Sequence, residues 1–217
     1  MQAEAPLFEK LAILVVGWLL GLLAPVIVDA IRRRRENTLG RQALLSELQE
    51  LGTTLALAVY GIRTDQGRVD RPFLEWLKAD VERHATSEEL QKLVSTLRGL
   101  IALSDADFLK MNAHVALKPR KATMLQHFAA PLLDSRVSAL WSFETSFQRQ
   151  LLEVKQHLSL LDDLVDRSRK YFDLTFTKLE GENPRLVQEN LEQASDEYAR
   201  RATLVVEKIR RLQGAWR

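Results

Sequence analysis

The sequence predicts an all-α protein in which one N-terminal transmembrane helix is followed by a cytoplasmic helical bundle carrying a long antiparallel coiled-coil hairpin. Three observations lead to this fold class. An uncharged run of 18 residues extends from Leu11 to Val28, apolar residues farther along repeat at alternating spacings of 4 and 3, and the 217 residues include only nine glycines and six prolines. Long apolar runs are typical of membrane spans, and spacings of 3 and 4 are typical of helices.

The predicted transmembrane helix comprises residues 11–31. At about 1.5 Å per residue the uncharged run covers roughly 27 Å, which is close to the thickness of the hydrocarbon core of a bilayer. Two further apolar residues extend the helix past the single charge of Asp29. Because Asp29 lies three residues before Arg32 and four before Arg33, we expect it to pair with one of them on the same helical face.

A basic cluster sets the predicted orientation of this helix. The span is followed directly by Arg32, Arg33, Arg34 and Arg35. Basic residues next to a span resist translocation, so we expect the arginines on the cytoplasmic side. The sequence therefore predicts a short extracytoplasmic N-terminus at residues 1–10, a basic juxtamembrane segment at 32–41, and a single pass through a cell inner membrane with the N-terminus out.

Two other interpretations of the N-terminal segment stay open. One is a cleaved signal peptide, whose first region is normally positively charged, whereas residues 1–10 carry two acidic residues and one basic residue. Four arginines would also open the mature chain and oppose its export. The other is a buried core helix of a soluble protein, because leucine, valine and tryptophan suit a protein core as well as a bilayer.

Residues 42–135 are predicted to form a helical body. Their first helix has an apolar face made of Leu44, Leu48, Leu51 and Leu55. The turn composition of residues 65–67 is expected to end it. We expect Pro72 at the first position of the next helix, Thr86 as the cap of a third helix, and Ser104 as the cap of a fourth.

Residues 136–213 are predicted to form a long helical hairpin with its turn at 181–184. Two stretches of mostly apolar residues at spacings of 4 and 3 form heptad seams, and a Gly-Glu-Asn-Pro turn separates them. In the first stretch the spacings alternate throughout, with two polar entries. Pairing within one chain and pairing between two chains are both open. The first seam consists of Phe147, Leu151, Val154, Leu158, Leu161, Val165, Ser168, Phe172, Thr175 and Leu179. The second seam consists of Val187, Leu191, Ala194, Tyr198, Arg201, Val205, Ile209 and Leu212.

Charge and cysteine content exclude several classes of function. Residues 36–217 contain 26 basic and 26 acidic residues, so the part beyond the arginine cluster is neutral. A nucleic-acid-binding domain normally has a basic footprint, and nucleic acid is therefore not an expected partner. The chain has no cysteine, which excludes disulfides, thiolate catalysis and cysteine metal sites.

The chain contains none of the common catalytic or phosphate-binding motifs. Gly-x-x-x-x-Gly-Lys, His-Glu-x-x-His and Gly-x-Ser-x-Gly are all missing. Asp162 and Asp166 share a helical face and could hold a cation, but the three basic residues that follow favour a neutralised, solvated face. We expect no catalytic residue, cofactor or metal, and therefore no enzyme. A site assembled only by folding is the alternative, which His114 or His127 beside a buried carboxylate would support.

Gly17 and Gly21 lie four residues apart within the predicted span. Small residues at this spacing let two membrane helices approach closely, so this pair is a candidate helix–helix contact and a homo-oligomer is a candidate state. Together the observations predict a membrane-anchored cytoplasmic scaffold that tethers a protein partner to the inner membrane, with membrane lipid as its other partner. The alternative is an oligomerising membrane effector or channel-like component controlled by its cytoplasmic helical domain.

Overall fold

The fold is seen in a computed structural model that describes residues 5–84, 87–116, 124–136, 140, 142–177 and 183–216, without the side chains of residues 5–10, Arg33, His84 and Ala116. The described residues form helices, turns and irregular segments, and they include no strand. The predicted all-α class is therefore confirmed. The chain divides into two compact units, Met1–Leu44 and Leu45–Arg217, which are considered separately.

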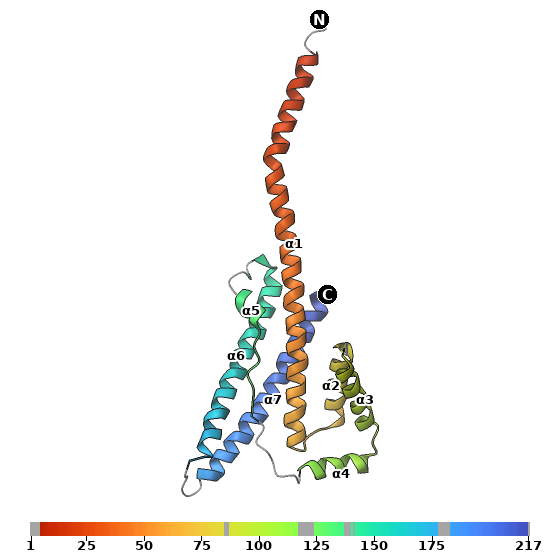
Figure 1. The fold of residues 1–217 in the computed structure, drawn as a ribbon, viewed down its shortest axis with the longest axis vertical. Coiled ribbons are helices and arrows are strands. Elements are labelled where there is room, and N and C mark those ends of the chain that lie inside the picture. Colours follow the sequence, from red (N-terminus) through yellow and green to blue (C-terminus); the bar gives the residue numbers. More distant parts are fainter. Residues whose placement is uncertain are drawn as a thin grey trace. The chain divides into compact units, whose positions relative to one another are not determined.

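The first unit consists of the N-terminal part of helix α1, which as a whole runs from Ala5 to Asp65 (Figure 1). An 18-residue window of this helix has a mean hydropathy of 2.7, and none of that window is buried. The helix is thus long and apolar enough to cross a membrane. It continues through Pro25, which lies inside the helix. Residues 11–31 and 32–41, which the sequence divides into a span and a juxtamembrane segment, belong to the same helix.

The second unit begins with the rest of α1, which ends at Asp65 as predicted. Gly67 closes this end with a φ of 64°, a left-handed conformation that glycine adopts without steric cost. Helix α2, Arg71–His84, starts after Asp70, whose carboxylate accepts a 2.8 Å hydrogen bond from the amide of Phe73. Pro72 is therefore the second helical residue and not the first, because Asp70 provides the cap one position earlier than expected.

Helix α3, Glu88–Ile101, packs against α2. Its cap is Ser87, which has an extended backbone and accepts a 3.3 Å hydrogen bond from the amide of Leu90. The prediction of Thr86 as the cap was wrong by one residue, and Thr86 itself lies outside the described residues. Helix α4, Asp105–Ala116, starts as predicted after Ser104, whose hydroxyl accepts a 3.2 Å hydrogen bond from the amide of Asp107.

The described residues of the second unit contain three further helices: α5, Pro131–Arg136, α6, Thr145–Leu174, and α7, Asn183–Trp216. Helices α6 and α7 pack side by side and run in opposite directions (Figure 1). The interlocking of side chains that defines a coiled coil stays a prediction. The seam residues Leu151, Val154, Leu158, Leu161, Val165, Leu191, Tyr198 and Val205 are all buried.

The first seam is shorter than predicted at its C-terminal end. Thr175 lies beyond the last residue of α6 and is exposed. Its hydroxyl donates a 2.6 Å hydrogen bond back to the carbonyl of Phe172. Phe172 is half-buried. The predicted seam residue Leu179 and most of the predicted turn at 181–184 lie outside the described residues.

Helix α7 is buried on two sides. Beyond the predicted seam its buried residues include Ala199, Ala202 and Val206. Helix α7 also meets α1, since a Cβ placed on Gly52 would lie 3.5 Å from Cγ2 of Ile209, a residue of the predicted seam. The side chain of Gln213 also donates a 3.4 Å hydrogen bond to the carbonyl of Leu45. Helix α7 therefore lies in the core of the second unit, between α6 and the end of α1.

Candidate functional site

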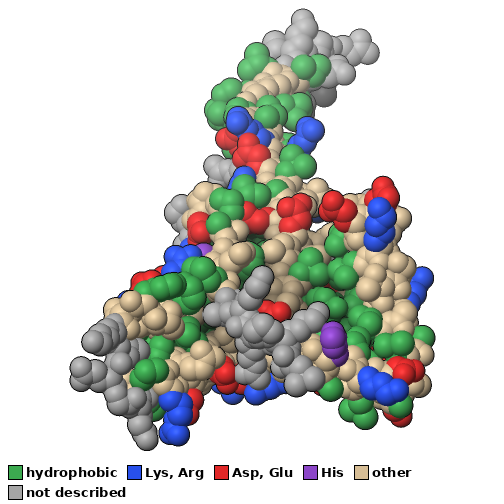
Figure 2. Space-filling view, turned by 60° about the horizontal axis from the view of Figure 1, so that its bottom comes forward, with side chains coloured by type: hydrophobic (Ala, Val, Ile, Leu, Met, Phe, Trp, Pro, Cys, Tyr) green, Lys and Arg blue, Asp and Glu red, His purple; other side chains and the backbone are tan. Residues whose placement is uncertain are grey.

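The most distinctive surface of the described chain is the apolar N-terminal part of α1. The side chains of Leu14, Trp18 and Val26 are exposed to 72%, 64% and 65%. Figure 2 shows hydrophobic side chains gathered along this part of the helix, followed by basic ones. A contiguous apolar surface of this length is unusual for a soluble protein and marks an interaction site or a membrane segment. A core helix of a soluble protein would be mostly buried, so the exposure does not fit that alternative.

Gly17 and Gly21 lie in open surroundings. A Cβ added to either residue would have no neighbour within 4 Å among the described atoms. Since one chain is described, contact with a second copy of the helix stays a prediction. The helix surface at Gly17 and Gly21, called the glycine strip, is accessible to such a copy, because no described atom of the same chain would contact a Cβ added there.

Among the arginines that follow the apolar segment, Arg32 pairs with Glu36 and not with Asp29. Nε of Arg32 lies 2.9 Å from Oε1 of Glu36, one turn farther along the helix, so Glu36 takes the place expected for Asp29. The side chain of Arg33 lies outside the described set. Arg34 and Arg35 are exposed, and among the described residues neither forms an ion pair.

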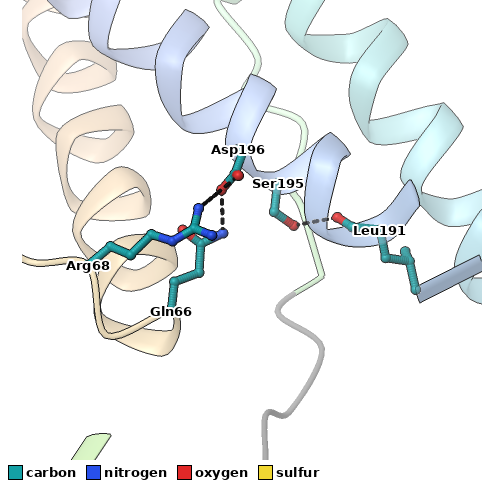
Figure 3. A network of polar contacts seen from close by, with 5 residues as sticks. All are labelled: Gln66, Arg68, Leu191, Ser195 and Asp196. Atoms are coloured by element: carbon teal, nitrogen blue, oxygen red, sulfur yellow. Dashed lines mark hydrogen bonds and ion pairs between the residues drawn. The ribbon is translucent and has the colours of Figure 1, made fainter. Parts of the chain in front are cut away.

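A polar network joins the turn after α1 to α7 (Figure 3). Nη1 of Arg68 lies 2.8 Å and 2.9 Å from the two carboxylate oxygens of Asp196, and Nε2 of Gln66 lies 2.7 Å from Oδ1 of the same residue. The Arg68 and Asp196 side chains are 59% and 45% exposed. Exposed ion pairs contribute about 0–1 kcal/mol, so this network positions the turn and adds little stability.

A buried ion pair joins α7 to α2. Nε of Arg210 lies 2.7 Å from Oδ1 of Asp80, and the two side chains are only 16% and 3% exposed. The guanidinium also lies 4.4 Å above the ring of Trp76 and donates a 3.2 Å hydrogen bond to the carbonyl of that residue. The second oxygen of Asp80 is buried without a hydrogen-bond partner among the described atoms. The pair therefore depends on Arg210 to neutralise a buried carboxylate.

His127 lies between the two carboxylates that the sequence suggested as a cation site. Its Nδ1 is 2.7 Å from Oδ1 of Asp162, and its Nε2 is 3.2 Å from Oδ1 of Asp166. The two side chains are 48% and 62% exposed, so they are not the buried carboxylates that would indicate an enzyme. No group of metal-ligating residues occurs in the described part of the chain. Sequence reasoning missed this contact, because His127 lies 35 positions from Asp162 in an irregular segment.

Ser159 lines the same shallow groove as His127 and Asp162. In a serine–histidine–aspartate arrangement, the histidine nitrogen not held by the aspartate activates the serine hydroxyl. Here that nitrogen faces Asp166 instead. These residues therefore do not have the geometry of a hydrolase triad.

Tyr198 of the second seam ties α7 to the same irregular segment. Its hydroxyl donates a 3.1 Å hydrogen bond to the carbonyl of Gln126. Burial, with a smaller contribution from the charge of Asp162, raises the pKa of Tyr198 above its ordinary value. The phenol therefore stays protonated at neutral pH and acts as a structural donor.

The chain matches no protein-family model, no curated protein and no solved structure. The candidate functional features described above are the exposed apolar helix, the arginines that follow it, and the packed helical body.

Proposed function

We propose that this protein is a single-pass membrane anchor with a cytoplasmic helical body, and that it tethers a protein partner to the inner membrane of a bacterial cell. The observation that carries the proposal is the exposed apolar segment at residues 11–31 on the same chain as a packed, neutral helical body. A chain of this kind keeps its body at the membrane surface. The body offers long helical faces, and such faces are common protein-binding surfaces.

The proposed orientation rests on the charges beside the span. Arg32 to Arg35 follow it, whereas residues 1–10 contain only Lys10 as a basic residue. The positive-inside rule assigns the basic end to the cytoplasm. The body, Leu45–Arg217, then lies in the cytoplasm with the partner.

The tether is tested by comparing bacterial cells with and without the gene that encodes this chain. We expect at least one otherwise soluble protein to leave the membrane fraction when the gene is deleted. Its membrane association returns with the full chain and not with a Leu19→Arg/Leu20→Arg variant that cannot insert. An unchanged membrane proteome contradicts the tether.

The alternative, an oligomerising membrane effector or channel-like component, is favoured by one observation. The strip at Gly17 and Gly21 is open along the span, so two copies of the helix could approach closely there. Light scattering of the full chain in mild detergent distinguishes the two functions. An effector is an oligomer that a Gly17→Ile/Gly21→Ile variant breaks into monomers, and a Gly61→Ile variant is the control outside the span. For a tether, we expect the full chain and the Gly17→Ile/Gly21→Ile variant to have the same size.

A further inference from the structure

The four arginines at residues 32–35 form a collar around α1. Successive residues of an α-helix are rotated by about 100°, so four in a row cover nearly the whole circumference. The collar follows the apolar segment 11–31 directly and lies within one helix. Arg32, Arg34 and Arg35, whose side chains are described and exposed, therefore lie on different sides of that helix, at the level where a membrane has its headgroups.

The collar is only partly neutralised by its own chain. Residues 29–36 carry four arginines against Asp29 and Glu36, which leaves a net charge of +2. Arg32 pairs with Glu36 at 2.9 Å, whereas Arg34 and Arg35 are exposed and have no ion pair among the described residues. Arginine side chains have an apolar stem and a charged end that reaches toward the membrane surface. The guanidiniums of Arg34 and Arg35 are thus available to an external anion.

We propose that this arginine collar is a binding site for anionic phospholipid headgroups, with Arg34 and Arg35 as its principal contacts. The inference rests on the proposed membrane anchor and names the lipid class that it selects. A guanidinium presents its N–H groups in a planar fork that matches phosphate oxygens, and a net positive collar favours an anionic lipid over a zwitterionic one. The collar gathers these lipids around the anchor.

The test measures lipid binding to the full-length protein in mild detergent by native mass spectrometry. The probes are equimolar phosphatidylglycerol and phosphatidylethanolamine with the same acyl chains. We expect phosphatidylglycerol adducts to dominate, and an Arg34→Gln/Arg35→Gln variant to lose the preference by about fivefold for each arginine removed. An Arg34→Lys/Arg35→Lys variant keeps most of it. The matched control is Arg169→Gln/Arg211→Gln, which removes two exposed arginines from the body and leaves the preference unchanged.

Each other outcome overturns the proposal. Equal binding of both lipids shows that the collar does not select charge, and an equal loss in the body variant shows that the effect is one of net charge alone. Displacement of phosphatidylglycerol by millimolar inorganic phosphate identifies a free-anion site instead of a lipid site. Failure of the proposed membrane anchor is recognised separately, by alkaline carbonate extraction of cell membranes. A protein that does not insert is extracted by carbonate, whereas an inserted protein that merely lacks the lipid preference is not.

Discussion

Helix α1 contains two segments whose apolar side chains have opposite surroundings. In residues 11–31 every side chain is exposed, whereas in residues 45–65 Leu48, Leu55 and Val59 are fully buried. The backbone is α-helical in both segments, so the distribution of polar residues makes the difference. Apart from Asp29 the first segment is apolar all round, which suits a helix surrounded by lipid, and the second has an apolar stripe that a protein core covers. The comparison teaches that an apolar segment without a polar face can stay uncovered by the rest of the chain, whereas an apolar stripe beside polar residues is covered by a protein core.

The largest effect is expected from the buried ion pair of the body. Replacement Asp80→Ala leaves the guanidinium of Arg210 buried without its carboxylate, and we expect a loss of about 3–5 kcal/mol in the free energy of unfolding. Urea unfolding followed by circular dichroism measures it. Glu88→Ala, which breaks an ion pair with side chains 79% and 73% exposed, is the matched control and costs under about 1 kcal/mol.

The double variant Asp80→Leu/Arg210→Met sharpens this prediction. It removes both charges, so much of the stability lost in Asp80→Ala returns. A double variant as unstable as the single one would show that packing around α2, and not the unpaired charge, determines the loss.

The same substitution in the two segments of α1 tests the comparison itself. Leu55→Ala removes a side chain that is fully buried, and we expect the body to lose about 2–5 kcal/mol of stability. Leu20→Ala removes one that is 61% exposed and leaves the unfolding of the body unchanged. Equal losses for the two variants would mean that the first segment packs against protein.

A charge in the first segment tests its apolar surroundings directly. An arginine near the middle of a transmembrane helix raises the insertion free energy by about 2.5–3.5 kcal/mol, so Leu20→Arg shifts the protein toward the soluble or aggregated fraction. Fractionation of cells measures the shift. Leu204→Arg on α7, at a side chain 39% exposed, leaves the distribution unchanged.

The smallest effect concerns pH. Burial, with smaller contributions from the charges of Lys208 and Arg201, lowers the pKa of His157 below its ordinary value. His157 therefore binds a proton more readily in the unfolded chain than in the folded one. The free energy of unfolding consequently declines as pH falls below the ordinary pKa of histidine. We expect the urea concentration at the unfolding midpoint to decrease when the pH is lowered from 7.5 to 5.5, and to decrease less in a His157→Gln variant. An equal fall in both proteins assigns the pH dependence to other groups.

Local features of the fold could be predicted from the sequence. The end of α1, the cap at Ser104 and the buried face of α6 follow from nearest neighbours along the helix, whose spacing the sequence displays. The starts of α2 and α3 differ from the predicted ones by one residue, because Asp70 and Ser87 accept the hydrogen bonds from the first amide groups of these helices.

Long-range features could not be predicted in the same way. Asp80 and Arg210 meet across 130 positions, and nothing in the local pattern of either residue indicates a partner. The second buried side of α7 was missed for a related reason. A heptad seam indicates one packing face, whereas α7 is also buried at Ala199, Ala202 and Val206 outside the seam, and it meets α1 at Ile209 and Gln213.

The central claim is that residues 11–31 cross a membrane and leave the body in the cytoplasm. Because the chain has no cysteine, one introduced cysteine reports its own location. Variants Ala3→Cys and Ala215→Cys are expressed in bacteria and treated with a membrane-impermeant maleimide before and after permeabilisation. The account predicts that position 3 is labelled in intact cells and position 215 only after permeabilisation. Labelling of position 215 in intact cells, or a mature protein that lacks the first 30 residues, would contradict it.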